Sequence, residues 1–317
     1  MKKEGKNKAI MEAALLLALF AVICIFVPGF LSKANLLNVL RQASYTVIPA
    51  VALTMVIITS GINLSLGGIM SLAGVLGAIL INKNLSPVVV FIIVGVMGIA
   101  CGILNGYLIA QMRLPAFICT YTVGQIAAGL ALLICNAKAV RVSDPDFIAF
   151  GNARVFGVQL IIFIAAIFAL GAWFLLHRTP FGIRVYALGN NETILRQEGI
   201  SIVKLQIIIY SLSCLFSALC GVLLMARLGS GSPVQGEDYT LTCIAACVIG
   251  GVDMAGGYGR IPNTVVGSII ICIINNILNL LAINNNLQQI ILGSLIIILV
   301  GMSAFSAQGR LKLQAKY

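Results

Sequence analysis

The feature that most limits what this chain can fold into is a succession of long apolar segments that carry almost no charge. Ten segments can be marked, at 12–30, 45–60, 67–81, 86–111, 115–135, 158–177, 205–228, 239–252, 262–281 and 287–305. A helix of about 20 residues crosses the apolar part of a bilayer, so most of these segments are long enough to span it. Charged residues make up only 9% of the sequence, too few to cover the surface of a soluble protein. The sequence predicts an all-α integral membrane protein with about ten transmembrane helices.

Two of the segments, 67–81 and 239–252, are short and adjoin glycine-rich stretches. A membrane tolerates an interrupted helix only where protein or a water-filled cavity satisfies the free backbone groups. We therefore expect these two segments to form short, broken or re-entrant helices that line such a place.

Basic residues between the segments predict how the chain is oriented. Loops that stay in the cytoplasm carry an excess of Lys and Arg. The strongest basic clusters, near both ends of the chain and within 178–204, agree with ten crossings that begin and end in the cytoplasm. We expect one transmembrane domain over 1–317, with cytoplasmic tails at 1–11 and 306–317 and a cytoplasmic loop at 178–204.

The segments lack the groups that an ion-coupled transporter uses. Apart from Glu12, His177 and Arg227 near segment ends, they contain no Asp, Glu, Lys, Arg or His. A proton- or sodium-coupled transporter accepts the cost of placing such groups in the membrane because they bind the driving ion. The chain also has no P-loop motif to hold a nucleotide. These observations favour an energy source outside the chain.

Other classes of site are disfavoured as well. No serine nucleophile has a base, because the only histidine is His177 in a cytoplasmic loop. The nine cysteines form no CxxC pair and nearly all lie in apolar segments, where cysteine acts as a small buried hydrophobe. The net charge of +11 is spread in ones and twos between apolar runs, unlike the basic patches of nucleic-acid-binding proteins. We expect no catalytic residues, no metal site, no cofactor and no nucleic-acid partner.

What the segments do contain is uncharged polarity. The amides and hydroxyls within them are Asn63, Ser65, Ser71, Asn105, Thr120, Thr122, Gln125, Asn275, Asn276 and Asn279. Each of these residues can hold helices together by hydrogen bonds across the membrane. As a set they would also suit the passage of a neutral, hydroxyl-rich solute. We take Asn63, Ser65, Asn105, Asn275 and Asn279, the last two on one helix face, as candidates for a translocation path.

The longest cytoplasmic loop contains a predicted short helix. Asn191 is a suitable N-cap, Glu192 and Arg196 are spaced to form an ion pair, and Gly199 is a suitable C-terminal stop. A two-turn helix is marginal alone in water, so it needs a partner to pack against. From these residues alone, either a docking helix for another protein or an ordinary connecting loop is possible.

The longest outside loop is 136–157, where Asp144 and Asp146 flank a proline. Both aspartates are candidates for docking an extracytoplasmic partner, and a solvated linker is the alternative. Glu237 and Asp238 are also expected in an outside loop, between two later segments.

In several motifs the chain resembles the membrane permease subunits of bacterial ABC importers for simple sugars, of the ribose type. These motifs are residues 38–42, 57–67, 102–106, 179–182, 187–191, 226–229 and 248–251, and the similarity runs from about 35 to about 303. One departure is Asn63, where the family usually has aspartate. The motifs are specific to the superfamily and only weakly to the substrate.

The resemblance implies a complex in the bacterial inner membrane. It would contain two permease subunits, as a homodimer or heterodimer, two cytoplasmic ATPase subunits and an extracytoplasmic sugar-binding protein. The loop that holds Arg196, Gly199 and Ile200 matches the segment of the family that docks into the ATPase. The function implied is ATP-driven import of a monosaccharide such as ribose, with ATP hydrolysed by the partner. Alternatives are a permease for nucleosides or branched-chain amino acids, an ion-coupled secondary transporter or a passive channel.

Overall fold

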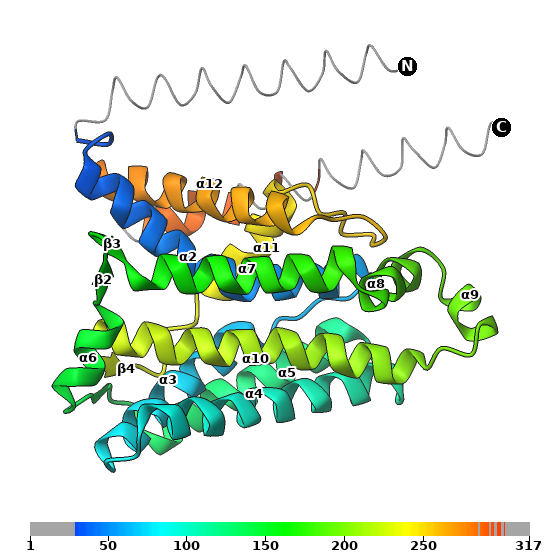
Figure 1. Cartoon of the computed structure of the whole chain (residues 1–317), viewed down its shortest axis with the longest axis horizontal. Coiled ribbons are helices and arrows are strands. Elements are labelled where there is room, and N and C mark those ends of the chain that lie inside the picture. The colour runs from blue at the N-terminus through cyan, green and yellow to red at the C-terminus, as the bar shows by residue number, and fades with distance from the viewer. Residues whose placement is uncertain (1–28, 285, 292, 295–296, 299–300, 302–317) are drawn as a thin grey trace.

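The computed structural model is mostly helical, and it describes residues 29–284, 286–291, 293–294, 297–298 and 301 (Figure 1). The predicted cytoplasmic tails at 1–11 and 306–317 lie outside these residues. The apolar segments 12–30 and 287–305 lie largely or partly outside them. The count of ten spans and the cytoplasmic position of both termini therefore stay predictions.

Among the described residues, six helices are long and apolar enough to cross a membrane. They are α2 (Lys33–Ile58), α4 (Pro87–Ala110), α5 (Ala116–Ile134), α7 (Leu160–Arg178), α10 (Ile202–Leu228) and α12 (Ile261–Leu280). Two shorter apolar helices are α3 (Leu66–Asn82) and α11 (Tyr239–Ile249). These eight helices correspond to the eight internal apolar segments, and the two segments expected to be short are α3 and α11.

Small elements gather at the two ends of the helical bundle. One end, which we call the α6 end, holds α6 (Pro145–Gly151) and the paired strands β1 (Val140–Arg141) with β4 (Ser230–Gly231) and β2 (Arg154–Val155) with β3 (Val158–Gln159). Both strand pairs are antiparallel, with Val140 opposite Gly231 and Arg154 opposite Gln159. The other end, which we call the α9 end, holds α8 (Pro180–Asn190) and α9 (Glu192–Gln197), as Figure 1 shows.

Helix α2 forms the centre of the bundle. Its residues are buried almost continuously from Ala43 to Ile58, and it contacts α7, α10, α11 and α12. Pro49 within α2 has no N–H to donate to the carbonyl of Tyr45. The Cys220 thiol on α10 donates to this carbonyl, with Sγ 3.2 Å from the oxygen. A thiol of a neighbouring helix thus replaces the lost backbone hydrogen bond.

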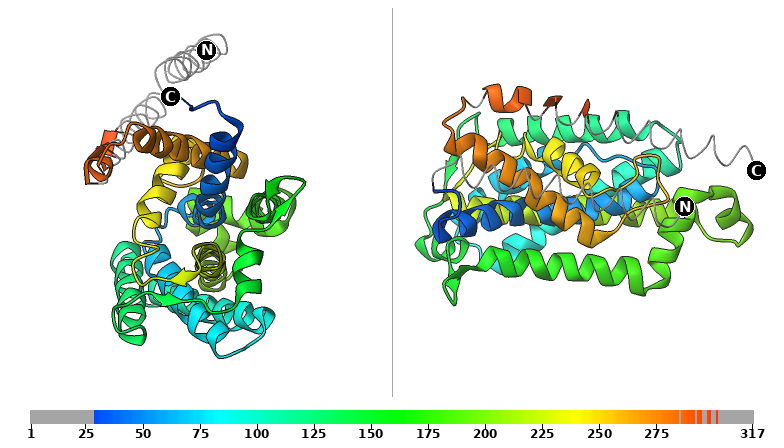
Figure 2. Two further views of the ribbon diagram at one scale, coloured as in Figure 1. Left: turned by 90° about the vertical axis from the view of Figure 1, so that its left-hand side faces the viewer. Right: turned by 90° about the horizontal axis from the view of Figure 1, so that it is seen from above.

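Helices α4 and α10 pack closely because glycine recurs along one face of α4. A methyl group on Gly98 would lie 2.9 Å from the Cys214 carbonyl oxygen, and one on Gly102 would overlap the backbone of Ser211. Small residues at this spacing let two helix backbones approach each other in a membrane. Viewed along the bundle, α11 and α12 lie on one side of α2, and α4 and α5 lie on the far side beyond α10 and α3 (Figure 2).

Candidate functional site

Two interrupted helices meet inside the bundle. The N–H of Gly67, near the start of α3, donates to the Thr240 hydroxyl near the start of α11, at 2.9 Å. The N–H of Gly236 donates to the Ser71 hydroxyl at the same distance. A methyl group on Gly67 or on Gly236 would overlap the carbonyl oxygen of the other glycine. The segment before α11 therefore lies with its backbone directly on α3.

Residues 232–238 return from the α6 end into the bundle, which the sequence did not reveal. Gln235 ties this segment down, because its Nε2 donates to the carbonyls of Gly221 at 3.2 Å and Met70 at 3.4 Å. Its Oε1 accepts from the N–H of Ser232. These contacts supply the protein partners that non-helical backbone needs at membrane depth. Glu237, expected in an outside loop, follows Gly236 at the point where this segment lies on α3, and it is exposed.

Three of the five candidates for the translocation path lie together in a closed cluster. The Asn63 Oδ1 atom accepts from the Ser65 hydroxyl at 2.6 Å, and Asn105 Nδ2 donates to that hydroxyl at 3.0 Å. Asn63 Nδ2 donates to the Ser213 hydroxyl at 3.0 Å, and the Cys214 sulfur is also within reach. We call these five residues the amide cluster. It is fully buried and fixes the extended segment before α3 against α4 and α10.

The other two candidates lie on α12, away from the amide cluster. Helix α12 packs mainly on α2, α7 and α11. Asn279 Oδ1 accepts from Gln288 Nε2 at 3.0 Å, and the oxygen of Asn275 is buried without a hydrogen-bond partner among the described residues. The neighbouring Asn276 pairs with Asn35 on α2. The structure therefore divides the predicted path residues into two separate groups.

A cavity of about 400 Å³ lies on the other side of residue 64 from the amide cluster. We call it the lateral cavity. It is lined by Leu64, Gly67, Gly68, Ser71, Phe117, Tyr121, Gly124, Gln125, Ala128, Leu132, Pro233, Val234, Glu237, Thr240 and Leu241. Its lining offers hydroxyl groups, an amide and a carboxylate beside two aromatic rings.

The aromatic wall of the lateral cavity comes from α5. The rings of Phe117 and Tyr121 are stacked, with centroids 6.1 Å apart and planes 2° from parallel. Both side chains are at least half exposed, at 58% and 50%. Gln125 continues the same helix face one turn later and is also exposed. The i, i+4 spacing of the two rings is visible in the sequence, but only the partner elements reveal that they face a cavity.

The α9 end carries the predicted coupling residues. Asn191 Oδ1 accepts from the Thr193 N–H at 2.9 Å and so caps α9. Arg196 Nε donates to the Glu192 carboxylate at 3.0 Å, and this ion pair is exposed to solvent. Gly199 has φ +72°, where a side chain would be strained, so glycine ends the turn. The predicted helix, its cap and its stop are thus present.

One hydrogen bond closes the end of α9, and another holds α8 to the loop before α12. The Ile200 N–H donates to the carbonyl of Leu195, whose side chain is buried. On α8, the Tyr186 hydroxyl donates to the Gly259 carbonyl oxygen at 2.5 Å. Burial raises the pKa of Tyr186, so the hydroxyl stays a proton donor. In contrast, Ile194 of α9 is 51% exposed, which leaves an apolar side chain free at this end.

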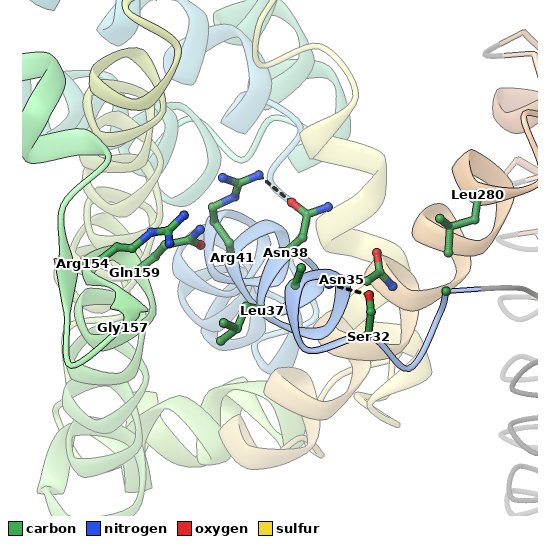
Figure 3. A pocket seen from close by; sticks show the side chains of 11 residues that line it. Ser32, Asn35, Leu37, Asn38, Arg41, Arg154, Gly157, Gln159 and Leu280 are labelled. Atoms are coloured by element: carbon green, nitrogen blue, oxygen red, sulfur yellow. Dashed lines mark hydrogen bonds between the residues drawn. The ribbon is translucent and has the colours of Figure 1, made fainter.

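The α6 end combines acidic and basic groups. Asp144 Oδ1 accepts from the N–H groups of Asp146 and Phe147 and so caps α6. Nearby, a cavity of about 550 Å³ is lined by Arg41 and Arg154, which extend toward it from α2 and from β2 (Figure 3). Arg41 donates to Asn38 Oδ1. No acidic residue is among the described residues that line this cavity.

Within the described part of the chain, no group of three or more His, Cys, Asp or Glu residues is placed to hold a metal ion.

Comparison with known proteins identifies the family. Residues 35–300 match the family described as "Branched-chain amino acid transport system / permease component". The ribose import permease protein RbsC of Escherichia coli is 37% identical over 289 residues, which cover 90% of each chain. The L-arabinose permease AraH and the D-allose permease AlsC of the same organism are 34% and 35% identical, covering 88% and 86% of this chain and 85% and 84% of their own. No solved structure matches. The chain therefore belongs to this family of transport-system permease components.

Proposed function

We propose that the chain is the membrane-spanning permease subunit of an ABC importer that moves a monosaccharide into a bacterial cell. The observation that carries the proposal is the similarity, over 86–90% of this chain, to permeases for ribose, L-arabinose and D-allose. The lateral cavity supports the same conclusion, because aromatic faces, amides and hydroxyls are what a neutral sugar needs. The residues that line it include no Lys or Arg that would pair with the carboxylate of an amino acid.

We place the sugar path along the lateral cavity and not through the amide cluster. The rings of Phe117 and Tyr121 form an exposed wall, so the cavity is open on the side of α5. A second permease subunit, identical or related, would close this side and complete the path. The fully buried Asn63, Ser65 and Asn105 then hold in place the segment before α3 that lines the cavity. Asn275 and Asn279 lie on α12, which packs against other helices.

The α9 end is proposed to face the cytoplasm and dock the ATPase subunit. Asn191, Glu192 and Gly199 give α9 defined ends, and Ile194 offers an apolar contact. Movement of α9 would reach the membrane helices through α8 and α10, which flank it in the chain. The chain itself would hydrolyse no ATP. The loop 178–204 and the tails 1–11 and 306–317 would then all lie in the cytoplasm.

The α6 end is proposed to face outward and seat the sugar-binding protein. Asp144 and Asp146 present acidic groups there, and Arg41 and Arg154 present basic groups in the neighbouring cavity. A surface with both signs of charge favours one orientation of a docking partner. Membrane lipid would surround the exposed apolar faces of α4 and α7.

Reconstitution in liposomes tests the function. The permease, an ATPase subunit and a binding protein from the same operon would be combined, and uptake of D-ribose, L-arabinose and D-allose measured with internal ATP. Uphill accumulation of one sugar is expected only when all components are present. Accumulation without the ATPase subunit, or uptake that follows a proton or sodium gradient, would contradict the proposal.

Two substitutions test the coupling role of the α9 end. Arg196→Glu breaks the ion pair with Glu192, and Gly199→Pro blocks the positive φ that ends the turn. Each variant is expected to lose sugar uptake while the complex still hydrolyses ATP. Arg196→Lys keeps the positive charge and Gly199→Asn tolerates the positive φ, so these two variants serve as the matched controls. Wild-type uptake in both Arg196→Glu and Gly199→Pro would remove the coupling role.

A further inference from the structure

Glu237 stands out because it is the one acidic residue among the described residues that line the lateral cavity. Its neighbour Gly236 lies on Gly67, and from there α3 continues to Asn82 at the α6 end, a rise of about 22 Å. On the opposite wall, the backbone of Gly68 touches that of Gly124. Glu237 therefore lies about halfway along the bundle, level with the middle of α5.

The carboxylate of Glu237 has no partner among the described residues. The one ion pair among the described residues joins Arg196 and Glu192, at the α9 end. The lining of the lateral cavity contains no basic side chain among the described residues. The backbone N–H of Glu237 donates to the Val234 carbonyl, but its carboxylate makes no hydrogen bond within the described structure. An acidic group at this depth is costly unless it faces water or a ligand, and such groups mark substrate pathways.

The groups that face Glu237 across the cavity define what it can bind. Gln125 follows Gly124 on α5 at the same level and provides a donor and an acceptor. Thr240 and Ser71 add hydroxyl groups to the same cavity lining. Tyr121 and Phe117 present aromatic faces one and two turns farther along α5. A carboxylate accepts two hydroxyl groups at once, and an aromatic face suits the C–H surface of a sugar ring.

We propose that Glu237 accepts hydrogen bonds from two adjacent hydroxyl groups of the monosaccharide as it passes the lateral cavity, and that it thereby sets which sugars pass. This inference rests on the proposed function. It makes Glu237 a specificity-determining residue, because a sugar that lacks one of the two hydroxyls leaves part of the carboxylate unpaired. Once a second permease subunit closes the cavity, as proposed above, a polar site that loses one partner discriminates far more strongly than an apolar one.

The test uses the complete importer with one binding protein throughout, so that the binding protein's own preference cancels between variants. The variants are Glu237→Ala and Glu237→Gln. The control is Asp238→Asn, since Asp238 is the adjacent exposed acid and does not line the cavity. Uptake would be measured for whichever of D-ribose, L-arabinose or D-allose the wild type imports, and for its deoxy analogues.

Glu237→Ala is expected to slow uptake of the parent sugar about tenfold or more, because hydrogen bonds to a charged group are lost. The uptake rate of the parent sugar divided by that of one deoxy analogue should fall toward one. Glu237→Gln should recover part of the rate, and Asp238→Asn should match the wild type.

Unchanged rate and selectivity in Glu237→Ala would overturn the inference. A Glu237→Ala variant that loses only the uptake of a cationic amino sugar would also overturn it, because the carboxylate would then act by charge pairing and not by accepting from hydroxyl groups. If the wild-type complex imports none of these sugars, the proposed function fails instead.

Discussion

The amide cluster and the lateral cavity are built from similar polar groups at a similar depth, yet they are opposite kinds of site. They lie on the two sides of the extended segment that leads into α3. Asn63 and Ser65 face the cluster, whereas Leu64 between them lines the cavity, as expected where successive side chains of an extended chain point in opposite directions. In the cluster most polar atoms pair with one another, although the Asn105 Oδ1 atom is buried without a partner among the described residues. In the cavity several polar groups face open space.

This difference distinguishes polar side chains that hold the helices of a membrane protein together from polar side chains that can bind a solute. Asn63, Ser65 and Asn105 are fully buried and hydrogen-bonded to one another or to α10. Such a network stabilises a helix arrangement. Gln125 and Glu237 are exposed to the cavity, and their polar groups are free for a ligand. We therefore expect substitutions in the cluster to change stability and substitutions in the cavity to change transport.

The largest effect is expected where the two regions share a wall. In Gly68→Ala the added methyl group would overlap the Gly124 carbonyl oxygen and force α3 and α5 apart. We expect a loss of about 3 kcal/mol or more, seen as poor yield and a lower melting temperature in detergent. Gly129→Ala on α5 is the control, because no atom lies within 4 Å of its added methyl. Equal melting temperatures for the two variants would show that this wall is not tightly packed.

A smaller loss of stability is expected in the amide cluster. Asn63→Ala removes the hydrogen bonds to Ser65 and Ser213 and leaves both hydroxyls buried with fewer partners. We expect a destabilisation of about 2 kcal/mol. Thermal melting of the purified protein measures it. If Asn63→Ala melts like the wild type but stops transport, the cluster is part of the path and the comparison is wrong.

In the lateral cavity the expected effect falls on transport alone. Gln125→Ala should lower sugar uptake about tenfold, equivalent to about 1.4 kcal/mol, because an amide that faces the sugar is lost. The melting temperature should not change, since exposed substitutions usually alter stability by less than about 0.5 kcal/mol. Ile126→Ala, a neighbouring exposed residue outside the cavity lining, is the matched control and should retain uptake.

The smallest effect is expected at the proline in α2, far from both regions. Cys220→Ala removes the thiol that donates to the Tyr45 carbonyl but leaves the helix packing nearly unchanged. We expect a destabilisation of about 0.6 kcal/mol, the average for a hydrogen bond between membrane helices. Cys101→Ala, a half-buried cysteine on α4, is a suitable control. A loss of several degrees in the melting temperature of Cys220→Ala alone would show that the thiol matters more than expected.

Local features of the fold could be predicted from the sequence, and long-range ones could not. The apolar segments predicted the eight internal helices, and Asn191, Glu192 and Gly199 predicted α9 with its two ends. These signals lie within a few neighbouring residues. That Asn63 and Asn105 meet while Asn275 does not depends on which helices pack together, which no local pattern contains. The position of Glu237 could not be predicted either, because the sequence of residues 232–238 indicates only a loop. That this loop lies on α3 is visible only in the structure.

The most direct test of the central claim is thiol labelling in the assembled importer. Gln125→Cys and Asn105→Cys would each be exposed in membranes to a water-soluble thiol reagent, with the unsubstituted protein as background. The account predicts rapid labelling at position 125, slowed while sugar is being transported, and no added labelling at position 105. Labelling at position 105 that sugar slows, with none at position 125, would place the path through the amide cluster and contradict it.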